Sequence, residues 1–190
     1  MIHKLVSIMA VWDEQNMIAL SIESTRDIVF QYIVIIKEGT DKTKLVCEYM
    51  RDKFNLNMII VESNIKLREA RRLGFDISKE YADYYLIQDG DEIYFSEKEL
   101  RESGRKTITD LMSEGYTHAN TSMIYLKNDF LHTTDTTNWL IPHPFLLKNM
   151  GEIFWPNKGD LPYFKFEYSK FSYKFFDTGE KKSHINSIAI

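Results

Sequence analysis

Apolar and polar residues alternate along the first hundred residues in blocks that predict strands and helices in turn. Residues 28–36 are almost continuously apolar, which is typical of a strand covered on both faces. Val46, Met50 and Phe54 recur at helical spacing. We expect strands at 4–11, 28–36, 58–61 and from 84 to Asp89, helices at 14–24, 43–54 and 65–73, a short segment at 78–83, and a helix from Glu97 capped by Ser96.

This order of elements predicts the fold class. Strands that are each followed by a helix favour an α/β, Rossmann-like, doubly wound and mainly parallel sheet with right-handed crossovers. Beyond residue 100 we expect a helix at 107–114 and a strand at 118–126, and then short mixed strands and loops, because prolines and aromatic runs replace the regular pattern. No repeat or linker is visible, so residues 1–190 are expected to form one domain.

Composition narrows the function classes. A net charge of −4 and a pI near 5.8 give no basic surface for nucleic acid. The apolar amino-terminal run is interrupted by Trp12, and it is too short for a transmembrane segment, so we expect a cytoplasmic protein. Cys47 lies on the apolar side of a predicted helix and is expected to be a buried structural thiol.

The strand predicted from residue 84 ends on two acids that are separated by one glycine. Asp89 and Asp91 therefore lie at the carboxyl end of a strand, where ligands bind in open α/β sheets. Side chains two residues apart can face one cation, while Gly90 lets a phosphate approach the main chain. Oxygen ligands favour Mg²⁺ or Mn²⁺ over zinc. The alternative is a turn with solvated acids.

Four stretches together resemble GT-A glycosyltransferases, in particular the family-2-like group that uses nucleotide-diphosphate sugars. They are residues 8–16, 35–43, 64–75 and Asp89-Gly90-Asp91, which is similar to the family's DxD element. The chain departs from the family in having Asp13 for an asparagine, and Lys37 and Glu38 for two acids. The resemblance implies a GT-A fold in which residues 1–100 bind the donor and residues 101–190 form the acceptor side.

The resemblance also implies residue roles. Ala10 and Gly90 would border the donor, and Glu38 would accept a hydrogen bond from its base. Asp91 would hold the metal, with Asp89 contacting the metal or the ribose. Arg71 or Arg68 would contact diphosphate or nucleotide, and the alternative for both is a solvated helix face pairing with Glu69. His184 would complete the metal shell as a carboxy-terminal histidine, or would simply be exposed.

An inverting transfer requires a general base from the second half of the chain. The candidates are Asp129, Asp135, Asp160 and Asp177. We favour Asp160, in a polar loop between aromatic segments, and then Asp135, in a hydroxyl-rich loop. Either can also be an ordinary loop aspartate. The acceptor is expected to be a glycan, glycoprotein or lipid, and Trp139, Trp155 and Tyr163 either stack on it or belong to the core.

Two other classes stay open. A nucleotidyltransferase would also use paired acids and a metal, although no glycine-rich phosphate loop is visible among 8 glycines. A catalytically inactive glycan- or protein-binding module would retain the fold without the chemistry. The compact chain is also similar to small glycosyltransferases of crenarchaeal viruses, which would place it in the host cytoplasm.

Overall fold

The computed structural model describes residues 3–94, 108–116, 118–125, 143–151 and 186–189. For 118–125, 143–145 and 186–189 it describes the backbone alone. Within these ranges, eight strands form one sheet in the order β3-β2-β1-β4-β7-β6-β8-β5. The elements are β1 (Leu5–Val11), α1 (Ile18–Thr25), β2 (Gln31–Ile36), α2 (Thr43–Phe54), β3 (Met58–Glu62), α3 (Leu67–Ser78), β4 (Tyr84–Ile87), β5 (Glu92–Tyr94), β6 (His118–Tyr125), β7 (His143–Lys148) and β8 (Asn186–Ala189).

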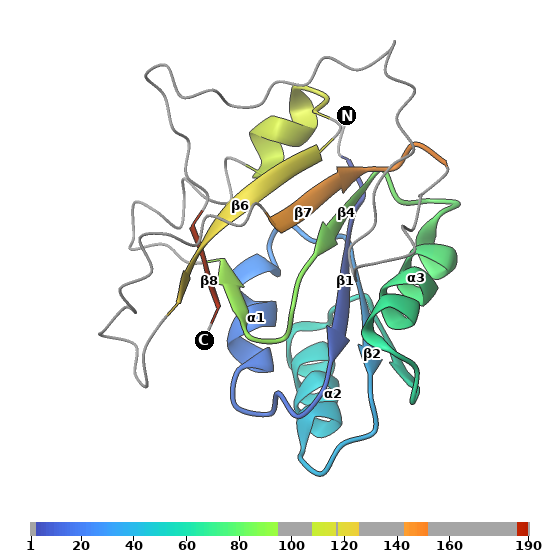
Figure 1. The fold of residues 1–190 in the computed structure, drawn as a ribbon, viewed down its shortest axis with the longest axis vertical. Coiled ribbons are helices and arrows are strands. Elements are labelled where there is room, and N and C mark those ends of the chain that lie inside the picture. The colour runs from blue at the N-terminus through green and yellow to red at the C-terminus, as the bar shows by residue number, and fades with distance from the viewer. Residues whose placement is uncertain (1–2, 95–107, 117, 126–142, 152–185, 190) are drawn as a thin grey trace.

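The parallel part of the sheet comes from the first half of the chain. β2 pairs with β1 and β3, and β1 pairs with β4, all in parallel. β7 then adds to β4 in antiparallel orientation, and β6 pairs antiparallel with β7 (Figure 1). The predicted α/β class with a mainly parallel sheet is therefore confirmed.

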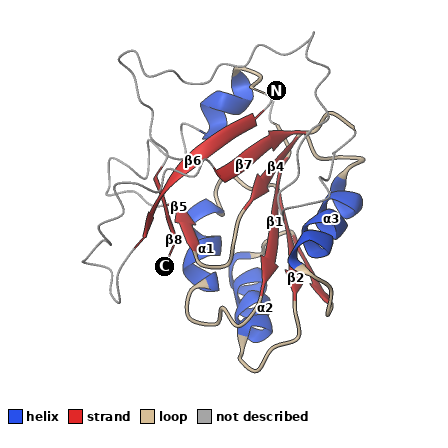
Figure 2. Cartoon of the chain, viewed as in Figure 1, coloured by secondary structure: helices blue, strands red, loops and turns tan. Residues whose placement is uncertain are grey.

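Helices cover both faces of the parallel strands, as Figure 2 shows. In β2, Ile33 and Ile35 pack in the core beneath α3, whereas Tyr32 and Val34 pack with residues of α1 and α2. This alternation follows from the two-residue period of a strand. All six residues of β2 are buried, as its continuous apolar run predicts. Cys47 is fully buried, so the prediction of a buried thiol is confirmed.

Several boundaries agree with the sequence pattern. α2 covers 43–54 as predicted, and residues 108–113 are helical where 107–114 were expected.

Two elements begin later than the sequence predicted. α1 begins at Ile18 instead of residue 14, because Glu14 to Met17 form a turn closed by hydrogen bonds from the Met17 and Ile18 amides to the Glu14 carbonyl. β2 begins at Gln31 instead of residue 28, because Ile28 and Val29 donate back to the Thr25 carbonyl.

The region around α3 corrects the prediction most. One helix runs through to Ser78, where the sequence predicted an end at 73 and a separate segment at 78–83. After β4 the described chain continues into the short strand β5. The helix expected from Glu97 lies outside the described residues.

Candidate functional site

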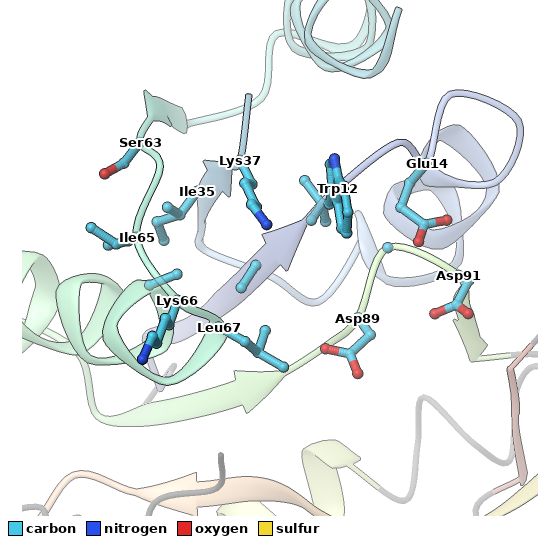
Figure 3. A pocket seen from close by; sticks show the side chains of 14 residues that line it. Trp12, Glu14, Ile35, Lys37, Ser63, Ile65, Lys66, Leu67, Asp89 and Asp91 are labelled. Atoms are coloured by element: carbon cyan, nitrogen blue, oxygen red, sulfur yellow. The ribbon is translucent and has the colours of Figure 1, made fainter. Parts of the chain in front are cut away.

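A pocket of about 330 Å³ opens at the carboxyl ends of β1, β2 and β4, beside the start of α3 (Figure 3). This is the edge at which parallel sheets bind ligands. Ile35, Ile65 and Leu67 give it an apolar wall, and three carboxylates, those of Glu14, Asp89 and Asp91, also line it. The two acids singled out from the sequence therefore do face a common pocket, together with a third.

The turn between β4 and β5 presents Asp89 and Asp91. Two reciprocal bonds close it: the Glu92 amide donates to the Asp89 carbonyl at 3.1 Å, and the Asp89 amide donates to Oε2 of Glu92 at 3.0 Å. Ser21 of α1 donates its hydroxyl to the same Asp89 carbonyl at 3.1 Å. The backbone that carries both acids is thus fixed from two sides.

A buried amide anchors this turn to the sheet. Gln88 is fully buried and donates to the carbonyl and the hydroxyl oxygen of Ser21, both at 2.9 Å. Its own oxygen accepts hydrogen bonds from Ser7 at 3.1 Å and Thr25 at 3.3 Å. Because buried polar groups require partners, this network links β1, α1 and the acidic turn into one arrangement.

Glu14 is the acid that sequence reasoning did not select as a site residue. It lies in the loop after β1, and Figure 3 shows its carboxylate and that of Asp91 on the same side of Trp12. Burial, and then the negative charges of Asp91 and Asp89, raises the pKa of Glu14 to about 7. Burial and Asp89 likewise raise the pKa of Asp91. In the sequence, the signal for Glu14 was its place in the stretch 8–16.

Arg71 reaches the site through Asp89. Its side chain is 3% exposed, and Nη2 donates to Oδ1 of Asp89 at 2.5 Å. The alternative of a solvated face is therefore wrong for Arg71. Arg68 is partly buried and lies outside the pocket lining. Glu69, its suggested partner, accepts the Lys66 amide at 3.0 Å and caps α3.

The end of β2 differs from the expectation for Glu38. Glu38 is exposed, lies outside the pocket lining and accepts a hydrogen bond from Asn64 at 2.6 Å. Lys37 lines the pocket instead, with its ammonium 4.0 Å from the centre of the Trp12 ring. Ala10 lines the pocket as well. At the end of β2, the charged side chain that faces the pocket is therefore the Lys37 cation and not the Glu38 carboxylate.

Gly90 lines the pocket between the two acids and is required by close packing. A Cβ at this position would lie 2.8 Å from Cγ of Glu14 and 2.9 Å from Cγ1 of Val11. The absence of a side chain lets the loop after β1 approach the acidic turn, which brings Glu14 close to Asp91. The predicted approach of a phosphate to this glycine stays a prediction.

Two acids outside the pocket hold its loops together. Asp13, with φ of 55°, accepts hydrogen bonds from the amides of Thr40 at 2.9 Å and Asp41 at 3.3 Å. Asp41 accepts from the amides of Thr43 at 2.9 Å and Gln15 at 2.8 Å. Although burial acts to raise it, the hydrogen bonds from the Thr43 hydroxyl and from the amides of Thr43 and Gln15 lower the pKa of Asp41. The loops that carry Trp12 and Lys37 are thus joined.

Comparison with known proteins gives the fold a name. No family model matches the sequence, and no curated protein matches it. Among solved structures, a 1–349 fragment of TarS from S. aureus matches with a TM-score of 0.53 and 15% identity, over 66% of this chain and 37% of that one. The same fragment in complex with UDP matches with a TM-score of 0.52 and 16% identity, over 66% and 37%. The fold is of the GT-A type.

The likeness extends to the fold only. The chain spans 37% of the TarS fragment, well under two thirds of it. A 4-diphosphocytidyl-2C-methyl-D-erythritol synthase from Anaerococcus prevotii is less similar, with a TM-score of 0.48 and 13% identity over 77% of this chain and 70% of that one.

Other predicted site residues lie outside the described part of the chain. They are Asp129, Asp135, Asp160, Asp177 and His184, with the aromatic residues Trp139, Trp155 and Tyr163. Within the described ranges, no three His, Cys, Asp or Glu side chains are already arranged to hold a metal ion. No helix in these ranges has the length and apolar character needed to cross a membrane.

Proposed function

We propose that the protein is a metal-dependent glycosyltransferase, which moves a sugar from a nucleotide-diphosphate donor to a glycan, glycoprotein or lipid acceptor. The observation that carries the proposal is the pocket itself. It combines Asp89 and Asp91 at the carboxyl end of β4 with the exposed indole of Trp12 and an apolar wall, on a GT-A fold. Acids suit a metal diphosphate, and the indole together with the apolar wall suits a nucleoside.

The acids fit a hard divalent cation. Glu14 and Asp91 both have raised pKa values because burial and neighbouring carboxylates disfavour their charged forms. A bound cation would lower both pKa values, because its positive charge favours the ionised carboxylates. Mg²⁺ and Mn²⁺ use few protein carboxylates and take their remaining ligands from phosphates and water, so the described side chains need not form a complete cage. Asp91 would hold the ion, with Asp89 beside it and His184 completing the shell.

Each side chain has a distinct role in this proposal. The cation would act as a Lewis acid and stabilise charge on the leaving diphosphate. Arg71 holds Asp89 in place, and its positive charge offsets the negative charge of Asp89, since the two form a close ion pair. Ser21 and Gln88 fix the backbone of the turn. Asp160, or else Asp135, would accept the proton of the acceptor hydroxyl.

Calorimetric titration tests the metal site. With Mn²⁺ present, we expect one of UDP, CDP, GDP and dTDP to bind, and we expect the Asp91→Asn variant to lose the metal dependence of that binding. Asp52→Asn is the matched control, because Asp52 is 70% exposed and lies outside the pocket. Metal-dependent release of the nucleotide diphosphate from a nucleotide sugar, with water taking the sugar in place of the acceptor, would then show that the protein cleaves the sugar–phosphate bond. Absence of nucleotide binding under all conditions contradicts the proposal.

A further inference from the structure

The pocket has two chemically different ends. Glu14, Asp89 and Asp91 give one end its negative charge. Figure 3 shows Lys37 on the other side of Trp12 from Glu14 and Asp91. A nucleotide that places its metal-bound diphosphate at the acidic end therefore directs its base toward the lysine end. This step rests on the proposed function.

The lysine end is suited to a flat heteroaromatic ring. Trp12 is 56% exposed, with the Lys37 ammonium over part of its ring, and Ile35 and Ile65 add apolar surface to the pocket lining. Stacking of a base on an aromatic side chain contributes to binding without depending on which base it is. The hydrogen-bonding groups at this end must therefore decide between bases.

The charged groups described at this end are hydrogen-bond donors. Lys37 and Lys66 both line the pocket, and an ammonium donates three hydrogen bonds and accepts none. The neighbouring carboxylate, Glu38, is engaged by Asn64 at 2.6 Å and lies outside the lining. The Lys37 ammonium lies over the Trp12 ring, 4.0 Å from its centre, and this cation–π contact holds the donor at the lysine end of the pocket.

We propose that Lys37 is a specificity-determining residue that selects the donor by its base. Its ammonium favours a base edge with adjacent acceptor atoms, such as O2 and N3 of cytosine or O6 and N7 of guanine. Uracil and thymine interrupt their acceptors with the N3–H group, which is itself a donor and finds no described carboxylate at this end. The protein therefore prefers cytidine or guanosine diphosphate to uridine diphosphate.

Titration of the full chain with CDP, GDP, UDP and inorganic pyrophosphate, each with Mn²⁺, tests this preference. We expect CDP or GDP to bind about tenfold more tightly than UDP, the size of one good base contact. Lys37→Met keeps an unbranched side chain at this position and removes the donor, so it should abolish most of that difference and leave pyrophosphate affinity unchanged. Lys37→Glu replaces the donor with an acceptor and should shift the preference toward UDP.

Lys53→Met is the matched control, because Lys53 also lies over aromatic rings, at 5.3 Å from Tyr49 and 5.0 Å from Phe54, but outside the pocket. It should leave the preference unchanged. Binding of UDP as tight as that of CDP and GDP overturns the inference while the proposed function stands. So does an equal loss of pyrophosphate affinity in Lys37→Met, which would make Lys37 a phosphate contact. Absence of all nucleotide binding overturns both.

Discussion

At the scale of single residues, Glu92 shows how the acidic turn tolerates its own charge. Its side chain is 1% exposed, and Oε2 accepts the Asp89 amide at 3.0 Å. Burial, and then the nearby charge of Asp89, raises the pKa of Glu92 to about 8. At neutral pH the carboxyl is mostly protonated, so it supports the turn without adding another negative charge beside Asp89 and Asp91.

The raised pKa of Glu92 predicts a pH dependence of stability. The folded state binds this proton more tightly than the unfolded chain, so the stabilisation is fully present below the unfolded pKa of about 4.5 and is lost as pH rises through about 8. We expect the free energy of unfolding to fall by about 2 kcal/mol between pH 5.5 and 7.5. Urea denaturation at several pH values measures this fall, to which Glu14 adds with the same sign.

The Glu92→Gln variant separates the contribution of Glu92 to this pH dependence from that of Glu14. The amide keeps an oxygen that can accept the Asp89 amide but does not titrate, so much of the pH dependence should disappear. Glu80→Gln, the same change at an exposed position, should leave the slope unchanged. A slope that is identical in the wild type and in Glu92→Gln would show that Glu92 is charged in the folded protein.

At the scale of secondary-structure elements, α3 illustrates how packing overrides a local signal. Gly74 favours a break in the sequence pattern, because glycine weakens helices by about 1 kcal/mol relative to alanine. In the structure it lies inside α3, and an added Cβ would be 2.5 Å from Cγ2 of Ile8 on β1. The glycine therefore lets the helix lie close against the sheet, and this close packing brings Arg71 within reach of Asp89.

Gly74→Ala should destabilise the protein although alanine is the better helix former. Overpacking costs about 1 to 3 kcal/mol, which exceeds the gain in helix propensity. Urea denaturation of Gly74→Ala, Ile8→Ala and the double variant forms a thermodynamic cycle. In the double variant the new methyl group fills space left by Ile8, so its stability should exceed the value expected from adding the two single changes. A stabilised Gly74→Ala variant would contradict this packing.

At the scale of the whole molecule, the pocket joins residues that are far apart in the chain. Glu14 follows β1, Lys37 follows β2, and Asp89 and Asp91 follow β4. Parallel pairing of these strands puts their carboxyl ends at one edge of the sheet. A ligand that contacts both ends of the pocket therefore stabilises the fold as a whole.

Thermal unfolding should report that coupling. At about 100 times its dissociation constant, a ligand that binds only the folded state stabilises it by about 2.7 kcal/mol. For a chain of this size the midpoint should rise by roughly 5 to 10 °C. We expect this shift with the preferred nucleotide and Mn²⁺ together. A shift of equal size with nucleotide alone would argue against the metal.

The sequence by itself determined the parallel α/β core and the place of its acids. Continuous apolar runs identify strands covered on both faces, and the end of such a run places Asp89 and Asp91 at a ligand-binding edge. These inferences succeed because periodicity and strand ends are local properties of the chain. The resemblance also selected Arg71 and the stretch that contains Glu14.

Only the tertiary structure decided which side chains meet. Arg71 pairs with Asp89, Glu38 turns toward Asn64, and Lys37 faces the pocket. Neighbours in sequence, such as Lys37 and Glu38, point in different directions at a strand end, and their directions depend on loops fixed by distant partners. Such long-range contacts leave no periodic trace in the sequence, because they arise from loop geometry and from the close approach that Gly74 and Gly90 permit.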